Sequence, residues 1–175
     1  MNKHKLAFSF IGIFIVQLSY AGYFKHIGRE EGLSQSSVMA IYQDKLGRMW
    51  FGTREGVNIY NSDRMTVYKA WIQNGNQPDQ KVLIGNEVSA ITGSQNGDVF
   101  LIVDRALLKY DIRKETFERL RQGSVYALTS HAGEIWCAGH DSIFRYNPQN
   151  NQLDFQQKTG IPVSYTHLRA HETDS

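Results

Sequence analysis

Charged side chains recur at one kind of turn in this chain of 175 residues. Arg54 and Glu55, then Arg105, and then His140 each follow a short apolar run with the pattern of a strand. Equivalent turns of repeated units point the same way, so these side chains could form a polar rim that binds a sugar or a sugar acid. The simpler interpretation is a set of solvated hairpin turns.

Trp71 is a different kind of candidate for ligand binding. It lies directly before a polar stretch, NGNQPDQ, which predicts a surface loop. An aromatic residue at this place is expected either to contact a ligand while partly exposed or to pack over a sheet edge. Trp50 and Trp136 occupy matching positions of a repeat and are expected in the core.

The sequence contains no recognisable catalytic or cofactor-binding motif. GxxxxGK[ST], GxGxxG, HExxH and GxSxG are all missing. We therefore expect no catalytic residue, no cofactor and no metal site in this chain. Cys137 is the single cysteine, which excludes an intrachain disulfide, and it is expected to be a small buried strand residue.

The net charge and the N-terminal segment limit the expected partners and location of the protein. The formal net charge is +2 and no basic stripe is interleaved with aromatics, so nucleic acid is not an expected partner. Lys3 and Lys5 precede the apolar run LAFSFIGIFIVQL, which is too short to span a bilayer comfortably. Residues 1–21 are therefore predicted to be a secretory signal peptide cleaved after Ala21; an uncleaved anchor or a buried helix is the alternative.

Three segments align with one another and indicate an internal repeat. Each opens with a β-branched residue, which is followed two positions later by Ala and then by an aliphatic residue, and then reaches a turn that ends in Gly47, Gly97 or Gly133. An apolar strand, a second turn, a Tyr-Asn or Tyr-Asp strand end and a short fourth run follow. Each unit therefore predicts four short strands joined by tight turns.

Four-stranded units of about 40 residues are typical of β-propeller blades. We predict an all-β fold, a propeller fragment in an open arc, with blades at about 38–69, 88–120 and 125–157 within a domain of residues 22–162. A sandwich or a β-solenoid is the alternative. Residues 23–27 resemble the fourth strand of a blade, but the first three strands of such a blade do not precede them. They are predicted to complete the last blade of the ring and so to close it.

The C-terminal residues 163–175 follow no part of the repeat. Residues 163–173, VSYTHLRAHET, are what a transposase-based sequencing adapter encodes when translated. We therefore predict that this tail is not native and that the reading frame is cut near Pro162. On this interpretation His167 and His171, spaced four apart like a metal-binding pair, have no function.

The stretch GLSQSSVMAIYQDKLGRMWFGTREGVNIYN resembles the two-component regulator propeller repeat. The other two units match less well. The second has Phe100 in place of the Trp of Trp-x-Gly-Thr, and the third keeps Trp136 but has Ala138-Gly139 in place of Gly-Thr. After a signal peptide, the repeat is similar to the N-terminus of the hybrid two-component sensor histidine kinases of Bacteroidetes.

The resemblance implies a periplasmic sensor domain that acts in signal transduction through a phosphorelay. It implies a small carbohydrate ligand, downstream sensor and kinase domains in the same parent chain, an inner-membrane anchor and a homodimeric parent. The fragment itself would not be an enzyme. An exported propeller enzyme, such as a lyase or glycan hydrolase, is the alternative.

Overall fold

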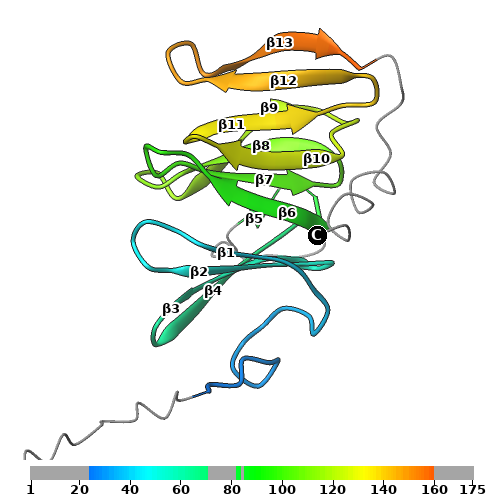
Figure 1. Ribbon diagram of the computed structural model, residues 1–175. Helices are drawn as coiled ribbons and strands as arrows, with labels where there is room; N and C mark the ends of the chain where they lie inside the picture. Colours follow the sequence, from blue (N-terminus) through cyan, green and yellow to red (C-terminus); the bar gives the residue numbers. More distant parts are fainter. Residues whose placement is uncertain (1–23, 71–81, 84, 160–175) are drawn as a thin grey trace, which may run out of the picture.

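The computed structural model describes residues 24–70, 82–83 and 85–159, and all regular structure in them is β-strand. The strands form three sheets that follow one another along the chain and stack face to face (Figure 1). The predicted all-β class with three four-stranded antiparallel units is confirmed. The predicted signal segment, Trp71 and the tail from residue 163 lie outside the described residues.

The first sheet has four antiparallel strands and one additional parallel strand at its outer edge. Its order is β1 (Val38–Gln43), β2 (Met49–Thr53), β3 (Gly56–Asn61), β4 (Arg64–Ala70) and β5 (Val82–Leu83). The short β5 pairs in parallel with β4 after the insertion, and Leu83 is buried. The sequence predicted only a surface loop there, because two apolar residues after a polar stretch are too few to show the alternation that indicates a strand.

The second and third sheets repeat the same up-and-down order. The second contains β6 (Val88–Gly93), β7 (Val99–Val103), β8 (Ala106–Asp111) and β9 (Thr116–Arg121). The third contains β10 (Ala127–His131), β11 (Glu134–Ala138), β12 (Ser142–Asn147) and β13 (Gln152–Lys158). Neighbouring strands are antiparallel in both sheets.

Burial explains why the middle sheet has the most continuous apolar sequence. Every residue of β7, VFLIV, is buried, because one face of the strand packs on the first sheet and the other on the third. A strand packed on both faces needs no alternation of apolar and polar residues. The outermost strands β9 and β13 contain no fully buried residue and are correspondingly polar.

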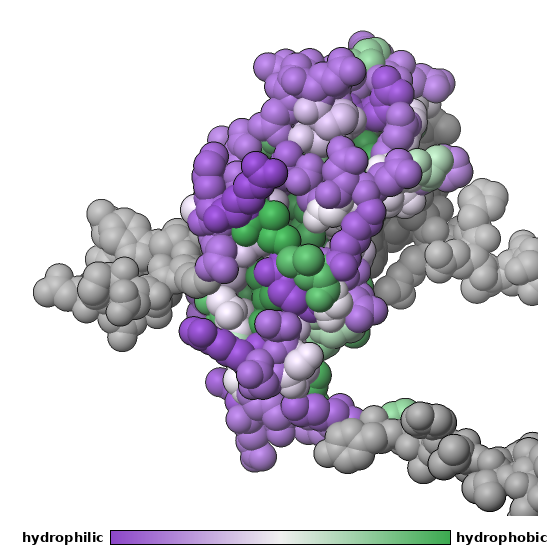
Figure 2. Space-filling view, turned by 90° about the vertical axis from the view of Figure 1, so that its left-hand side faces the viewer, coloured by the Kyte–Doolittle hydropathy of each residue, from purple (hydrophilic) through white to green (hydrophobic). Residues whose placement is uncertain are grey.

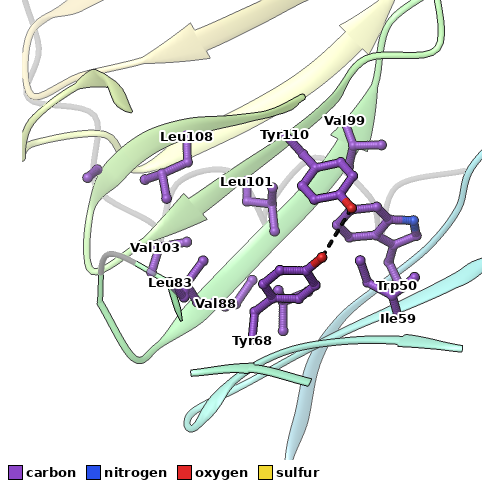
Figure 3. Close-up of a cluster of buried hydrophobic side chains, with 12 residues drawn as sticks. Trp50, Ile59, Tyr68, Leu83, Val88, Val99, Leu101, Val103, Leu108 and Tyr110 are labelled. Carbon is purple, nitrogen blue, oxygen red and sulfur yellow. Dashed lines mark hydrogen bonds between the residues drawn. The ribbon is translucent and has the colours of Figure 1, made fainter. Parts of the chain in front are cut away.

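Two separate hydrophobic cores hold the three sheets together. The core between the first and second sheets includes Trp50, Tyr68, Leu83, Leu101 and Tyr110 (Figure 3). In it the Trp50 and Tyr110 rings meet edge to face at 5.0 Å, and the Tyr68 and Tyr110 hydroxyls are 3.2 Å apart. The core between the second and third sheets includes residues with the same strand positions one unit later, among them Phe100, Cys137 and Tyr146.

The turn between β1 and β2 is organised by the buried carboxylate of Asp44. Its Oδ1 accepts hydrogen bonds from the backbone N–H groups of Leu46 and Arg48, at 3.0 and 2.9 Å. Its Oδ2 accepts from Arg48 Nε at 2.6 Å and from Trp50 Nε1 at 2.8 Å. Gly47 closes the turn with a φ of 79°, a left-handed conformation that glycine adopts without strain. The turn residue and the core Trp are therefore parts of one hydrogen-bonded unit.

Trp136 differs from the core position predicted for it. Ile135 and Cys137, its neighbours in β11, pack toward the second sheet, and side chains alternate along a strand, so Trp136 faces the other way. It is only half-buried, whereas Trp50 is fully buried between two sheets. Ile41 and Phe155 are more than half exposed on the outward sheets of the stack. The predicted burial of Cys137 is confirmed, at 3% exposure.

Candidate functional site

The predicted rim residues lie in equivalent turns at one end of the stacked sheets, which we call the rim end. Arg54 and Glu55 join β2 to β3, Arg105 joins β7 to β8, and His140 lies between β11 and β12. All four side chains are exposed. Within the described residues, no hydrogen bond or ion pair joins Arg54, Arg105 and His140 to one another. The structure thus brings their turns to one end but does not assemble a site from them.

Backbone hydrogen bonds hold the rim turns to the segments that link one sheet to the next. Gly56 N donates to Asn86 O at 2.8 Å, and Asp104 N donates to Glu87 O at 2.9 Å. Val125 N donates to Arg105 O at 3.0 Å, which repeats the arrangement one unit later. Main-chain hydrogen bonds therefore hold each linker to a rim turn at these positions.

Asp104 is a rim residue whose role the sequence did not predict. Its Oδ2 accepts from Asn86 N at 2.9 Å and its Oδ1 from Glu87 N at 3.0 Å, so one carboxylate fixes the linker into the second sheet. Asp104 and Arg105 both have left-handed backbones, with φ of 47° and 63°. This turn type suits twisted hairpins but usually carries Asn or Gly. The hydrogen bonds that Asp104 accepts thus stabilise a turn in which the Arg105 side chain points outward.

The remaining rim candidates have ordinary surface partners. Glu55 Oε2 lies 3.7 Å from Lys69 Nζ in an exposed ion pair, and the Arg105 guanidinium lies 5.5 Å from the centre of the Tyr126 ring. The hydrogen bond from Ser142 to Asp141, next to His140, and the nearby charge of Lys158 lower the pKa of the Asp141 carboxyl. These contacts orient the side chains but leave them accessible.

The Gly32-Leu33-Ser34 segment, the start of the best-matching repeat, has a structural place. Leu33 and Ser34 are buried against the outer face of the first sheet. Ser34 N donates to Asn58 Oδ1 at 2.7 Å, and the Ser34 and Thr53 hydroxyls are 2.9 Å apart. Residues 24–27 before it have no regular structure, and their predicted place in a closing blade stays a prediction.

Two grooves lie at the opposite end of the sheets, which we call the groove end. One, of about 310 Å³, lies between the first and second sheets over Tyr68 and Tyr110 and is walled by Arg64 and Glu115. The other, of about 410 Å³, lies between the turn at 94–98 and residues 133–135 and 145–149. Figure 2 shows this end, where apolar atoms lie in the hollows between hydrophilic turns. Sequence reasoning missed both grooves, because they form between units and not within one.

The described part of the chain lacks two further kinds of feature. No helix there is both long enough and apolar enough to cross a membrane. Across the same residues, His, Cys, Asp and Glu side chains do not gather in groups of three or more that could hold a metal ion.

Similarity to known structures defines the fold class as β-propeller-like. The extracellular domain of the hybrid two component system BT3049 of B. thetaiotaomicron superimposes with a TM-score of 0.63 over 78% of this chain and 20% of that chain, at 22% identity. The streptogramin B lyase structure gives a TM-score of 0.50 over 72% of this chain and 42% of that chain, at 17% identity. Likeness at these identities establishes the fold and not the activity.

Sequence similarity adds the type of repeat. Residues 32–55 match the family model described as the two component regulator propeller, and so the chain carries this repeat. The chain is also 39% identical over 64 residues to histidine kinase P4 of Formosa agariphila, a distant homologue. The match covers 37% of this chain and 5% of that protein, so this chain spans only a small part of the length of the curated relative.

Proposed function

We propose that this chain is the N-terminal part of a periplasmic propeller that senses a ligand for a two-component signalling protein, and that the ligand is an oligosaccharide. The observation that carries the proposal is the two component regulator propeller repeat at residues 32–55. The propeller-like fold shared with extracellular domains of hybrid two component systems supports it. The histidine kinase homologue supports a kinase as the output of the longer protein.

The proposed mechanism is a population shift between two arrangements of the propeller and its downstream domains. A ligand that binds one arrangement more tightly than the other shifts the equilibrium by that difference in affinity. The packing of the sheets supports such a coupling, because each sheet contacts the next through a packed core and through main-chain hydrogen bonds.

The first experiment reads the source genomic DNA without a break beyond the codon for Pro162. The proposal expects the frame to continue into further propeller repeats, a membrane-spanning helix and a histidine kinase, and expects the sequence of residues 163–175 to be absent from the genome. A stop codon directly after an encoded VSYTHLRAHET would contradict the proposal.

The second experiment tests sensing in the source bacterium. Transcription of the genes beside the sensor is measured after adding single oligosaccharides, in the native strain and in a strain that lacks the codons for residues 38–158. Induction by at least one oligosaccharide in the native strain only is the expected result. Induction that survives the deletion would assign sensing to another part of the protein, and cleavage of the sugar by the purified protein would favour the exported enzyme.

A further inference from the structure

The groove between the second and third sheets has the size of a ligand site and a partly apolar floor. Its volume of about 410 Å³ falls within the ~300–1,000 Å³ usual for pockets that hold small molecules. Ile135 and Tyr146 form its floor and are 1% and 5% exposed, so both are fixed by the core beneath them. A floor fixed in this way needs no rearrangement when a ligand binds above it.

The charged groups of this groove are already paired with one another. Asp98 Oδ2 lies 3.1 Å from Lys109 Nζ, which also donates to the Tyr146 hydroxyl at 2.8 Å. Burial would lower the pKa of Lys109, but its bonds to Tyr146 and Asp98 outweigh this and raise it, so the amine stays charged. Glu134 Oε1 and Arg145 Nη1 are 3.2 Å apart on the other wall. A ligand with a net charge would therefore have to break an existing pair.

Uncharged polar groups, in contrast, remain available on the same walls. The side-chain amides of Gln95, Asn96 and Gln149 line the groove and make no hydrogen bond with any described residue. The Ser94 hydroxyl is buried there without a hydrogen-bond partner among the described residues. An amide offers two donors and an acceptor, and a hydroxyl offers one donor and two acceptor lone pairs. This set matches the alternating donors and acceptors of vicinal hydroxyl groups.

We propose that the groove between the second and third sheets is a binding site for an uncharged, polyhydroxylated ring compound about the size of a disaccharide. The inference rests on the proposed sensing function, and it moves the contact from the rim end, where the sequence placed it, to the groove end. Asn96 and Gln149 are assigned as its hydrogen-bonding contacts.

The test uses the whole chain with maltose, cellobiose and lactose as probes, and binding is followed by saturation-transfer NMR and titration calorimetry. At least one probe is expected to bind, while glucuronate, a charged sugar, is not. The double variant Asn96→Ala/Gln149→Ala should weaken the Kd about tenfold, because two hydrogen bonds of about 1 kcal/mol or less each are lost. Both residues are exposed turn residues, so circular dichroism should show an unchanged fold.

The matched control is Arg54→Ala/Arg105→Ala at the rim end, which should leave the Kd unchanged. Loss of binding in this control, with normal binding in the groove variant, would overturn the groove site and leave the sensing function standing. Failure of all three disaccharides to bind would also overturn the groove proposal. The transcription experiment above decides the sensing function separately, because it does not depend on where or which oligosaccharide binds.

Discussion

The indole N–H of Trp50 donates a 2.8 Å hydrogen bond to the buried carboxylate of Asp44, six residues earlier in the chain. The bond joins a hairpin turn at the surface to the core between the first two sheets. The same carboxylate pairs with Arg48 at 2.6 Å, so its removal would leave a buried N–H and a largely buried guanidinium without their partner.

Replacement of Asp44 should therefore destabilise the chain. Asp44→Ala is expected to lower the free energy of unfolding by about 3 kcal/mol, because it leaves polar groups unpaired in the core. Asp44→Asn, which keeps an acceptor oxygen, should lower it by about half as much. Denaturant unfolding followed by Trp fluorescence measures both, and an unchanged midpoint for Asp44→Ala would show that the turn does not support the core.

The same residue predicts a loss of stability in acid. Burial alone would raise the pKa of Asp44, but hydrogen bonds from Trp50 and Arg48 and the charge of Arg48 outweigh it and hold the pKa below its ordinary value. A carboxylate with a lowered folded pKa contributes stability that is present above the unfolded pKa of about 3.9 and is lost as the pH falls through the folded pKa. Unfolding midpoints measured between neutral pH and pH ~3 should fall less steeply for Asp44→Asn than for the native chain.

Trp50 and Trp136 form a matched pair for a test of burial. Trp50 is fully buried and hydrogen-bonded, whereas the Trp136 indole N–H is buried with no hydrogen-bond partner among the described residues. Trp50→Phe should cost about 2 kcal/mol, since it loses ring volume and removes one of the two hydrogen bonds to Asp44 Oδ2. Trp136→Phe should change stability by less than about 0.5 kcal/mol, because it removes an unsatisfied donor from a half-buried ring. Equal losses in the two variants would contradict the assigned environments.

Gly47 and Gly56 allow the energetic cost of backbone conformation to be distinguished from the cost of side-chain overlap. Gly47 and Gly56 both have left-handed backbones, with φ of 79° and 108°, but a Cβ at Gly47 meets nothing within 4 Å and a Cβ at Gly56 would overlap the Tyr68 carbonyl. Gly47→Ala should cost about 1 kcal/mol from conformation alone. Gly56→Ala should cost about 3 kcal/mol or more, because the β3–β4 pairing must also shift. Thermal unfolding of the two variants compares them directly.

The outward faces of the stack predict self-association. Ile41 is 62% exposed on the outward face of the first sheet, and the half-buried Trp136 lies on the outward face of the third sheet. Phe155 pairs with Phe144 on the inner face of the third sheet, but it is 55% exposed because β13 is the edge strand. Sedimentation velocity should show association that increases with concentration. The variant Ile41→Lys/Phe155→Lys should shift the population toward monomer, while Arg54→Lys at the rim should not. A native chain that stays monomeric at all concentrations would contradict this expectation.

Cys137 should be chemically inert in the folded chain. Its thiol is 3% exposed, and burial raises its pKa to about 11, so little thiolate forms at neutral pH. A thiol reagent should label it only after denaturant is added, at the rate at which the third sheet opens. Rapid labelling of the native chain would show that the core between the second and third sheets opens easily.

The fold was largely predictable from the sequence because each unit carries its own signals. Gly47, Gly97 and Gly133 mark turns that need positive φ, and the structure gives all three that conformation. The apolar runs between them could be assigned to strands on local pattern alone.

What the sequence did not predict arises between units. The β5 strand forms only because β4 offers a free edge for pairing. Trp136 is only half-buried because its side of β11 does not pack on the second sheet. The clamp of Asp104 on Asn86 and Glu87 joins residues that are 18 and 17 positions apart, respectively. Each groove has one wall from each of two neighbouring sheets. These features are set by the packing of one unit on the next, which a repeat alignment does not contain.

Because main-chain atoms make the bonds between Gly56 and Asn86 and between Val125 and Arg105, these contacts do not depend on the side chains of Arg54, Glu55 and Arg105. Mutation can therefore change Arg54, Glu55, Arg105 or His140 one at a time without moving the scaffold that presents them. A surface built in this way can diversify rapidly over evolutionary time, and it offers a protein engineer a set of positions for library design whose substitutions leave the framework in register.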